Sequence, residues 1–508
     1  MAYTIAFEAP SIDWFALAPL LVLLGGGLLL LVAAALTPSW PRRMYAWTTA
    51  VVGLGAMVVT FFEWDNVTDY GSKFLVGDAL AFDAFSMFGT ITICAAVILA
   101  SLITDDYLDR EGMQGPEIYG LYLMAAIGAV VMVMSNDLIV LFLGLETLSI
   151  ALYVLAASHR RRTESQESGI KYFVLGGFSS AFFLYGIALI YGGTGSTNFN
   201  KILTAFDAVP LHRKDSMVLV GAGLLLVGLL FKVAAAPFHF WTPDVYQGAP
   251  TPVTAFMASA GKAAAFAAML RVLVVALPNW KDDWQPIIWV VAIITLLVGS
   301  ISAVVQTNVK RMLAYSSISH AGFILVGVEA AGHSGGSTGK GMPGVMLYLL
   351  LYTVLVIGTF GVVGLVSRTG DNATDLGSFR GLSKQKPLLA LALTLFLLAQ
   401  AGVPLTSGFV AKFGVIQAAV DQHSYALAII AMVSSVIGAF LYLRIMVSVW
   451  LADPEAADDT REAVTVPLSS GIAIALCVGF TLVVGIFPGW LIDASDKVVQ
   501  VAAPIIGG

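Results

Sequence analysis

The stretch LLFKVAAAPFHFWTPDVYQG, at positions 229–248, decides how this chain folds. Lys232 is the one charged residue in the run 217–236, in which every other residue is apolar or glycine. A charge at that depth costs several kcal/mol to place in a bilayer, and Pro237 removes a backbone hydrogen bond and interrupts a helix. The stretch therefore predicts a broken membrane helix with a buried lysine beside the break. Because burying this charge is unfavourable, its presence indicates that the lysine has a function.

Composition extends this interpretation to the whole chain. Of the 508 residues, 58% are hydrophobic and only 11% are charged, with a mean hydropathy of +0.88, whereas a soluble domain carries about 25% charged residues. Cys94 and Cys477 both lie inside apolar runs with no Cys or His at ligand spacing. We therefore expect a polytopic membrane protein with two buried thiols, no metal site and no iron–sulfur cluster of its own.

Runs of about 20 apolar residues, the length that spans a bilayer as a helix, predict an all-α fold with fourteen transmembrane helices. The runs lie at 14–37, 44–62, 79–104, 116–134, 137–158, 168–192, 217–247, 250–277, 286–306, 311–330, 344–367, 387–420, 424–452 and 466–489. The connections are too short for a sizeable soluble domain, and the tail from Trp490 is expected to follow the membrane interface.

Lys and Arg are divided unequally between the two sides of this layout. The connections that follow odd-numbered helices hold 13 of the 26 Lys and Arg residues, and those that follow even-numbered helices hold 6. The first group includes the run 160–162 as well as Lys310 and Lys384. Because basic residues are enriched in cytoplasmic connections, we expect both termini on the outer, periplasmic face.

Two of the predicted spans are too long for one straight helix. The segments 217–247 and 387–420 would reach about 46 and 51 Å as helices, whereas the hydrocarbon core is about 30 Å thick. Each contains a proline, Pro237 and Pro404. A tilted helix with a harmless kink would explain either segment alone, but two interrupted helices at corresponding positions are typical of the ion path of a transporter.

Ionisable residues inside spans are functional candidates by default. Glu146 and Lys262 lie about 14 and 18 Å into their spans, near the middle of the bilayer, where a side chain cannot reach water. Lys232 and Lys412 lie beside the two breaks, and a buried lysine gives up its proton more easily than an exposed one. His320 can pass a proton as a neutral imidazole, with a structural role in the core as its alternative.

Four further ionisable residues have weaker arguments for a role. Lys171 lies only about three residues into its span and can extend to the interface, so function and structure are equal alternatives. His239 follows the first break and would face water. Arg271 and Arg444 stay protonated, so we expect them to hold carboxylates or shape the local field, with Arg444 kept as a possible secondary member of a proton path.

The spacing of these residues indicates an internal repeat. Glu146 and His320 are 174 residues apart, Lys232 and Lys412 are 180 apart, and Lys262 and Arg444 are 182 apart. A five-helix unit used twice gives such spacing, and an odd number of helices inverts the second copy. The predicted units are N-terminal helices 1–3 (1–115), a first repeat of helices 4–8 (116–277), a second repeat of helices 9–13 (286–452), and helix 14 with its tail (466–508).

Four segments resemble the antiporter-like membrane subunits of respiratory complex I, the bacterial NADH:quinone oxidoreductase (NDH-1). They are ESGIKYFVLGGFSSAFFLYG (167–186), FKVAAAPFHFWTPDVYQGAPTPVTAFMASAGKAAAF (231–266), RMLAYSSISHAGF (311–323) and AGVPLTSGFVAKFGV (401–415). The resemblance covers nearly the whole chain. The lysines of GKAAAF and GFVAKF are similar to those of the subunit N branch, whereas subunit M typically has glutamate at the second position.

The resemblance implies fourteen helices, inverted repeats over helices 4–8 and 9–13, and breaks in helices 7 and 12. It implies that Glu146 pairs with Lys232, that Lys262 is the central lysine, that Lys412 faces the exit half-channel, and that His320 connects them. The chain would hold no cofactor, since partner subunits would carry FMN, iron–sulfur clusters and quinone. The implied neighbours are subunit M, the small subunit K and lipids, in a bacterial inner membrane, with no nucleic acid.

The function that follows is proton translocation by a membrane subunit of an NADH-driven translocase of the respiratory chain, without redox chemistry in this chain. One alternative is a subunit of a multi-subunit cation/proton antiporter, which would share the fold and the lysines but run on an ion gradient. Another is a membrane scaffold whose buried charges only specify packing. The second alternative predicts that Lys232 and Lys412 tolerate Met.

Overall fold

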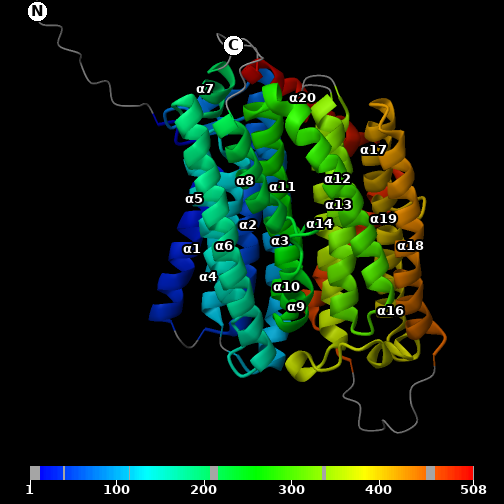
Figure 1. The fold of residues 1–508 in the computed structure, drawn as a ribbon. Helices are drawn as coiled ribbons and strands as arrows, with labels where there is room; N and C mark the ends of the chain where they lie inside the picture. The colour runs from blue at the N-terminus through cyan, green and yellow to red at the C-terminus, as the bar shows by residue number, and fades with distance from the viewer. Residues whose placement is uncertain are drawn as a thin grey trace, which may run out of the picture.

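The computed structural model describes residues 12–37, 40–113, 115–205, 216–333, 339–452 and 464–506. Long helices run side by side in one bundle, and α20 (Gly489–Ile506) lies across their upper ends in Figure 1, where it packs against α3 and α14.

In the described part of the chain, twelve helices are long and apolar enough to cross a membrane. Eleven are α1 (Ala18–Leu36), α2 (Arg42–Tyr70), α3 (Ala84–Arg110), α4 (Pro116–Met134), α5 (Leu138–Ala156), α6 (Thr163–Thr194), α12 (Lys281–Val304), α13 (Val309–His333), α14 (Gly341–Val366), α18 (Tyr425–Trp450) and α19 (Leu468–Ile486). The twelfth, Thr251–Ala276, consists of α10 (Thr251–Phe256), the π-turn η1 (Met257–Gly261), α11 (Lys262–Leu270) and the π-turn η2 (Arg271–Ala276).

The two overlong segments are each divided into two helices. The segment predicted at 217–247 forms α8 (Ser216–Lys232) and α9 (Trp241–Gly248), and that at 387–420 forms α16 (Pro387–Ala401) and α17 (Ser407–Asp421). Pro237 and Pro404 lie in the gaps, as expected from their missing N–H groups. At the first gap the polar groups find partners: the Ala236 N–H donates to Thr295 Oγ1 at 3.0 Å, and the Trp241 indole N–H donates to the Phe231 carbonyl at 3.0 Å.

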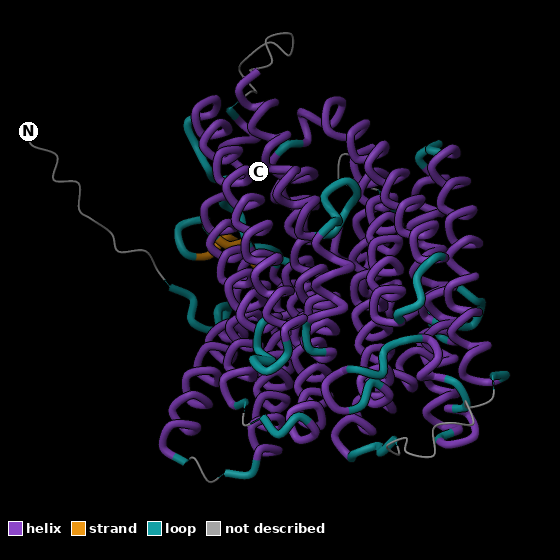
Figure 2. The backbone as a smooth tube through the Cα atoms, turned by 60° about the horizontal axis from the view of Figure 1, so that its bottom comes forward, coloured by secondary structure: helices purple, strands orange, loops and turns teal. Residues whose placement is uncertain are grey.

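Short elements join the long helices. They are α7 (Phe199–Thr204), the 3₁₀ turns η3 (Pro278–Trp280), η4 (Thr369–Asp371) and η5 (Leu376–Phe379), and α15 (Leu382–Gln385). The connection from α2 to α3 forms an antiparallel hairpin of β1 (Lys73–Leu75) and β2 (Leu80–Phe82), shown in orange in Figure 2. The prediction of a purely helical chain missed this hairpin, because three-residue strands leave no periodic signal.

Burial divides the helices into an inner and an outer set. We compared the most apolar stretch of 18 residues in each membrane helix. In α13, α14 and the helix 251–276, 94% of these residues are buried inside the protein, whereas the share is 22% in α1 and 33% in α6 and α18. Small residues allow some neighbours to approach closely: a Cβ atom at Gly186 of α6 would lie 2.6 Å from the Gly221 carbonyl oxygen of α8. The inner set holds the polar groups described below, and the outer set presents an apolar surface suited to lipid and to other membrane subunits.

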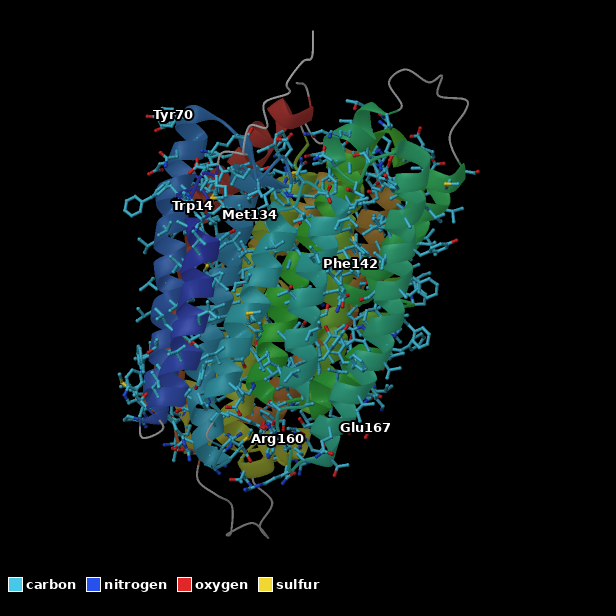
Figure 3. All side chains as sticks on the ribbon, turned by 90° about the vertical axis from the view of Figure 1, so that its left-hand side faces the viewer. Trp14, Tyr70, Met134, Phe142, Arg160 and Glu167 are labelled. Carbon is cyan, nitrogen blue, oxygen red and sulfur yellow. The ribbon has the colours of Figure 1, made fainter. Side chains whose placement is uncertain are left out.

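The bundle has two ends, which can be named from residues labelled in Figure 3. Arg160 and Glu167 lie at one end in Figure 3, and Trp14, Tyr70 and Met134 lie at the other. We refer to these as the Arg160 end and the Trp14 end. Lys310 near the start of α13 lies at the Arg160 end, where it shares a carboxylate with Arg162, so α13 runs from there to the Trp14 end.

Candidate functional site

The first polar cluster lies where α5, α6 and α8 meet. Lys232 is the last residue of α8 and is 8% exposed, and its Nζ lies 3.4 Å from the Tyr153 hydroxyl and 5.2 Å from the centres of the Tyr153 and Tyr172 rings. The Glu146 carboxylate is half-buried and accepts a hydrogen bond from Ser180. The described contacts include no ion pair between Glu146 and Lys232, whereas the family resemblance implies that they pair. The structure therefore places tyrosine, rather than carboxylate, against the lysine ammonium group.

The second cluster centres on Lys262, which is 2% exposed. Its Nζ donates to the Ser317 carbonyl at 2.6 Å and to the Ser317 hydroxyl at 2.7 Å, and the Tyr352 hydroxyl donates to the same serine oxygen at 2.8 Å. The Tyr352 ring centre lies 5.7 Å from the ammonium nitrogen, within the range of a cation–π contact. A buried lysine is thus held by α13 and α14 without a carboxylate.

Lys262 also lies directly after a π-turn, η1, and Arg271 begins a second one, η2. A π-turn inserts one extra residue into a helix, is rare, and often marks a functional position. Neither π-turn was predicted from the sequence. An inserted residue shifts the apolar face of an amphipathic helix, but this helix is buried on all sides and has no polar face against which a shift could be seen.

The third cluster surrounds His320 on α13. Its Nδ1 lies 2.6 Å from the Tyr348 hydroxyl, and its Nε2 lies 3.2 Å from the Tyr442 hydroxyl. Tyr442 is in turn 2.6 Å from the Ser316 hydroxyl. Both ring nitrogens therefore have hydroxyl partners, which can give or receive a proton with either imidazole tautomer.

The fourth cluster forms at the second helix break. Lys412 Nζ donates to the carbonyl of Ala401, the last residue of α16, at 3.1 Å, and to the Ser435 hydroxyl at 2.9 Å. The last carbonyls of a helix have no partners within that helix and carry partial negative charge. The break therefore supplies an acceptor for the lysine, and the Phe323 ring, whose centre is 4.6 Å from Nζ, covers its other side.

A cavity joins the third and fourth clusters. It has a volume of about 10 Å³, and its lining includes Ser316, His320, Lys412, Ser435 and Tyr442. Such a space is at the threshold for holding one water molecule, and its polar lining provides the partners that a buried water needs. One water there would bring His320 and Lys412 within reach of the same hydrogen-bonded chain.

Three further residues predicted from the sequence, Lys171, His239 and Arg444, lie outside these four clusters. Lys171 pairs with Asp244 at 2.8 Å and with Glu167 at 2.6 Å, and its side chain is 41% exposed. His239 is 8% exposed and its Nδ1 has no hydrogen-bond partner among the described residues. Arg444 donates to the Val304 and Gln306 carbonyls at the end of α12. Lys171 and Arg444 therefore tie helix ends together, and the structure does not bring either to the four clusters.

Arg271 holds a carboxylate, as its permanent charge predicts. Its Nη2 lies 2.7 Å from Asp83 Oδ1, with 3% and 0% of the two side chains exposed, and its Nε donates to the Val133 carbonyl at 2.5 Å. Asp83 also caps α3 by accepting from the Ser86 N–H at 2.7 Å. The sequence analysis did not single out Asp83, because it lies at a predicted helix start, where an acidic cap is ordinary.

Lys310, expected in the connection before the span at 311–330, is instead the second residue of α13. Lys310 is fully buried and lies 3.3 Å from Asp371, which also faces Arg110 at 3.6 Å and Arg162 at 3.5 Å. Burial raises the pKa of the Asp371 carboxyl, but Lys310, Arg110 and Arg162 outweigh it and hold this pKa below its ordinary value. This cluster joins α3, α13 and two connections, and no local pattern signals a contact between residues so far apart in sequence.

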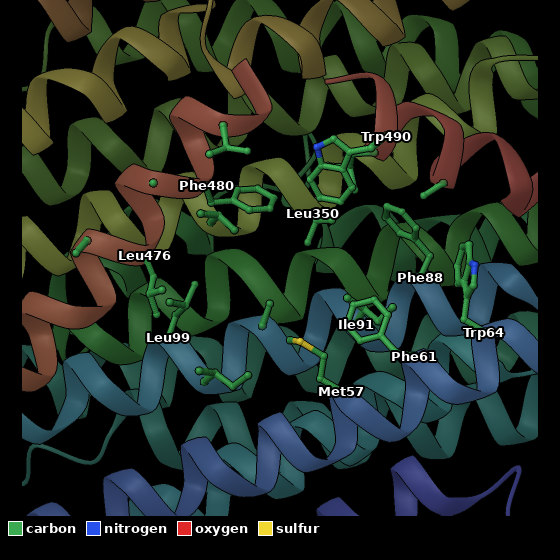
Figure 4. A pocket seen from close by; sticks show the side chains of 18 residues that line it. Met57, Phe61, Trp64, Phe88, Ile91, Leu99, Leu350, Leu476, Phe480 and Trp490 are labelled. Carbon is green, nitrogen blue, oxygen red and sulfur yellow. The ribbon is translucent and has the colours of Figure 1, made fainter. Parts of the chain in front are cut away.

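An apolar cavity of about 770 Å³ lies elsewhere, between α2, α3, α14, α19 and α20. Figure 4 shows Phe61, Trp64, Phe88, Phe480 and Trp490 around it, and every lining residue is apolar, aromatic or glycine. It offers no titratable group. Within the described ranges, no three His, Cys, Asp or Glu side chains are grouped so that they could hold a metal ion.

The fold and the line of buried lysines define an antiporter-like membrane protein, and comparison with known proteins agrees. Residues 135–438 match the family model described as NADH:quinone oxidoreductase/Mrp antiporter, transmembrane, so the chain belongs to this family. A chain of the Mrp complex from Dietzia sp. DQ12-45-1b has the same fold, with a TM-score of 0.83 over 97% of this chain and 99% of that one, at 21% identity.

Within the family, this chain is a subunit N of NADH-quinone oxidoreductase. NADH-quinone oxidoreductase subunit N 1 of Herpetosiphon aurantiacus is 43% identical over 504 residues, which cover 98% of this chain and 99% of the relative. A chain of respiratory complex I from Thermus thermophilus with bound aureothin is 31% identical, with a TM-score of 0.77 over 94% of this chain and 98% of that chain. The chain is therefore a membrane subunit of a translocase, which confirms the family resemblance.

Proposed function

We propose that this chain translocates protons through Glu146, Lys232, Lys262, His320 and Lys412, in that order along the membrane plane. The observation that carries the proposal is the set of three lysines buried without a carboxylate partner among the described residues, each held by hydroxyl groups, backbone carbonyls or aromatic rings. Burying a charge is unfavourable unless it is paired. Each lysine is therefore poised to exist in both protonation states, which a proton carrier requires.

The driving step is a change of charge near Glu146. Opposite unit charges 4 Å apart interact by about 4 kcal/mol at an effective dielectric constant of about 20. Glu146 and Lys232 are not in direct contact, so this figure is an upper limit: when the Glu146 carboxylate gains or loses a counter-charge, protonated Lys232 is destabilised or stabilised by a smaller amount. Redox chemistry in partner subunits would supply that change, because this chain offers only acid–base groups along the line.

The later steps follow the hydrogen bonds of α13. A proton that reaches Lys262 meets the Ser317 hydroxyl and Tyr352, and His320 lies one helical turn farther along α13. The cavity beside His320 leads to Lys412 at the break between α16 and α17. Between Lys232 and Lys262 the transfer requires water, since no described hydrogen bond joins their clusters.

The wider arrangement is part of the same proposal. We infer fourteen helices when α8–α9 and α16–α17 each count as one broken helix, with inverted repeats over 116–277 and 286–452 flanked by units 1–115 and 466–508. The Arg160 end would face the cytoplasm of a bacterium and the Trp14 end the periplasm. Subunits M and K would cover parts of the apolar outer surface, and partners would hold FMN, iron–sulfur clusters and quinone.

The test is Lys232→Ala in the assembled complex in native membranes. We expect assembly on a native gel to be unchanged, while NADH-driven quinone reduction and proton pumping fall together. Lys340→Ala, at an exposed position of the Trp14 end, is the matched control and should pump normally. Unchanged pumping in Lys232→Ala would remove this lysine from the path and leave it a structural role.

The antiporter alternative shares the fold, but its named structural neighbour is only 21% identical to this chain. An antiporter subunit would respond to an imposed sodium gradient in membranes without NADH. Proton movement that depends on NADH oxidation and is insensitive to sodium is the result expected for the proposed function.

A further inference from the structure

One buried carboxyl group on α13 is not used by the proposed path. Glu329 lies nine residues beyond His320 and is 2% exposed. Its Oε1 accepts from the Ser424 hydroxyl at 2.9 Å and is 3.5 Å from the Gln285 amide nitrogen, while its Oε2 is buried without a hydrogen-bond partner among the described residues. A carboxyl buried in a membrane protein and only partly satisfied is unfavourable, so its presence requires an explanation.

Glu329 is linked directly to the protein surface. His333 is the last residue of α13, four residues after Glu329, and its Nε2 lies 2.9 Å from Glu329 Oε1. The carboxyl side chain is 3% exposed and the imidazole is 37% exposed. Because imidazole takes up and releases protons near neutral pH, this pair connects a buried acid with water at the Trp14 end.

The same pair lies beyond Lys412 on the way out of the bundle. Phe323, whose ring covers Lys412, precedes Glu329 by six residues on α13, which corresponds to about 9 Å along the axis. Between them, Gly327 faces Val415 of α17: a Cβ atom there would lie 2.9 Å from a methyl carbon of Val415. Ser424, which donates to Glu329, directly follows α17 and its short connection. Lys412 and Glu329 therefore lie along one helix–helix contact.

We propose that Glu329 and His333 form the exit of the proton path, an inference that rests on the proposed function of Lys412. The Lys412 ammonium group gives a proton to the Glu329 carboxylate at Oε2, through water that must enter the contact between α13 and α17 during the transfer, because Gly327 and Val415 pack closely there. Rotation of the carboxyl group then brings this proton to Nε2 of neutral His333, which carries its own proton on Nδ1, and the imidazolium releases the Nδ1 proton to water. Lys412 ends neutral and Glu329 ends as the carboxylate, while His333 ends protonated at Nε2 and regains its Nδ1–H form by proton exchange with water.

A purely structural role makes the opposite prediction for two substitutions. Gln at position 329 keeps the length of the side chain and an acceptor oxygen for Ser424, but it cannot carry a proton. Asp keeps the carboxyl group but is shorter by one methylene group, which leaves a void and loosens its hydrogen bonds. Packing therefore favours Glu329→Gln over Glu329→Asp, whereas proton transfer favours Glu329→Asp over Glu329→Gln.

The experiment measures NADH-driven proton pumping per assembled complex in inverted membrane vesicles, with assembly determined on a native gel. Loss of a positioned proton carrier should lower pumping in Glu329→Gln by about tenfold or more, while Glu329→Asp keeps at least half. His333→Gln should lower pumping about twofold to threefold, a smaller loss than in Glu329→Gln, because water can replace a surface imidazole. Lys340→Ala, at an exposed position of the same end and outside the proposed exit, is the control and should pump normally.

Two results would overturn the exit inference: pumping by Glu329→Gln equal to or above that of Glu329→Asp, or unchanged pumping in His333→Gln. The second result decides the matter if neither Glu329 variant assembles, since His333 is at the surface and is not needed for packing. Lys412→Ala, measured in parallel, separates this inference from the proposed function. If Lys412→Ala stops pumping and Glu329→Gln does not, only the exit is wrong; if Lys412→Ala pumps normally, the whole path is wrong.

Discussion

Lys262 and Ser317 are joined twice: the lysine Nζ lies 2.7 Å from the serine hydroxyl and 2.6 Å from the serine carbonyl oxygen. Lys262 belongs to the helix 251–276 and Ser317 to α13, so this contact links residues from the two predicted repeats. The hydroxyl also accepts from Tyr352 of α14. A single serine therefore connects the central lysine to Tyr352, whose ring centre lies 4.8 Å from that of His320.

Ser317→Ala tests this connection. The backbone carbonyl will still hold Lys262, but the hydroxyl step to Tyr352 will be absent. Hydrogen bonds to charged groups contribute about 1.5–3 kcal/mol, so we expect pumping to fall by about tenfold or more with assembly unchanged. Ser101→Ala on α3, where the hydroxyl bonds the Ile98 carbonyl of its own helix, is the control for loss of a buried hydroxyl. Equal effects of the two substitutions would assign Ser317 to packing alone.

Lys412→Arg separates charge from proton release. Arginine keeps the positive charge and can donate to the Ala401 carbonyl, but it stays protonated at any accessible pH. We expect Lys412→Arg to assemble and to pump no better than Lys412→Ala, as measured by NADH-driven acidification of inverted vesicles. The reverse exchange, Arg444→Lys, is the control, because among the described residues Arg444 donates to the Val304 and Gln306 carbonyls and to no other group. Normal pumping by Lys412→Arg would mean that the charge, and not the proton, matters there.

Asp371 should contribute more to stability than Lys310. Removing Asp371 leaves Lys310, Arg110 and Arg162 close together without their shared carboxylate, and an uncompensated buried charge costs about 3–5 kcal/mol. Removing Lys310 leaves Asp371 with two arginines. We therefore expect Asp371→Asn to reduce the amount of assembled complex, measured on native gels after mild heating, more than Lys310→Met does. The opposite order would show that the lysine is the dominant cation of the cluster.

The pH dependence of this cluster follows from the low pKa of the Asp371 carboxyl. A carboxyl whose pKa is lower in the folded protein stabilises it at all pH values above the unfolded pKa of about 3.9, and the stabilisation is lost as the pH falls through the folded value. The contribution of Asp371 to assembly should therefore stay constant between pH 5 and 8. A difference between wild type and Asp371→Asn that disappears near neutral pH would contradict this assignment.

Orientation can be measured with single cysteines, since Cys94 and Cys477 are buried. Arg160 and Lys340 are both exposed. We expect Arg160→Cys to react with a membrane-impermeant maleimide only in inverted vesicles, and Lys340→Cys only in intact spheroplasts. The basic connections at the Arg160 end motivate this expectation, and the reverse labelling pattern would place the termini in the cytoplasm.

Much of the path could be predicted from charge and hydropathy alone. Lys232, Lys262 and Lys412 stand out because each interrupts an apolar segment, and Pro237 and Pro404 locate the two gaps to within a few residues. These signals are local: insertion cost and the loss of an N–H group depend on the residue and its immediate neighbours. Glu329 and Asp83 are also buried and ionisable, but both lie near the ends of predicted spans. A charge near a span end can reach water, so its position in the sequence does not indicate that it is buried.

By itself, the sequence determined the membrane class, the long helices, the two breaks and the identity of the buried lysines, because each depends on composition along one segment. Tertiary structure alone decided the partners. Ser317, Tyr442 and Asp371 reach Lys262, His320 and Lys310 from helices or connections more than 50 residues away. Such contacts depend on how separate helices pack, and packing is a property of whole surfaces rather than of any local run.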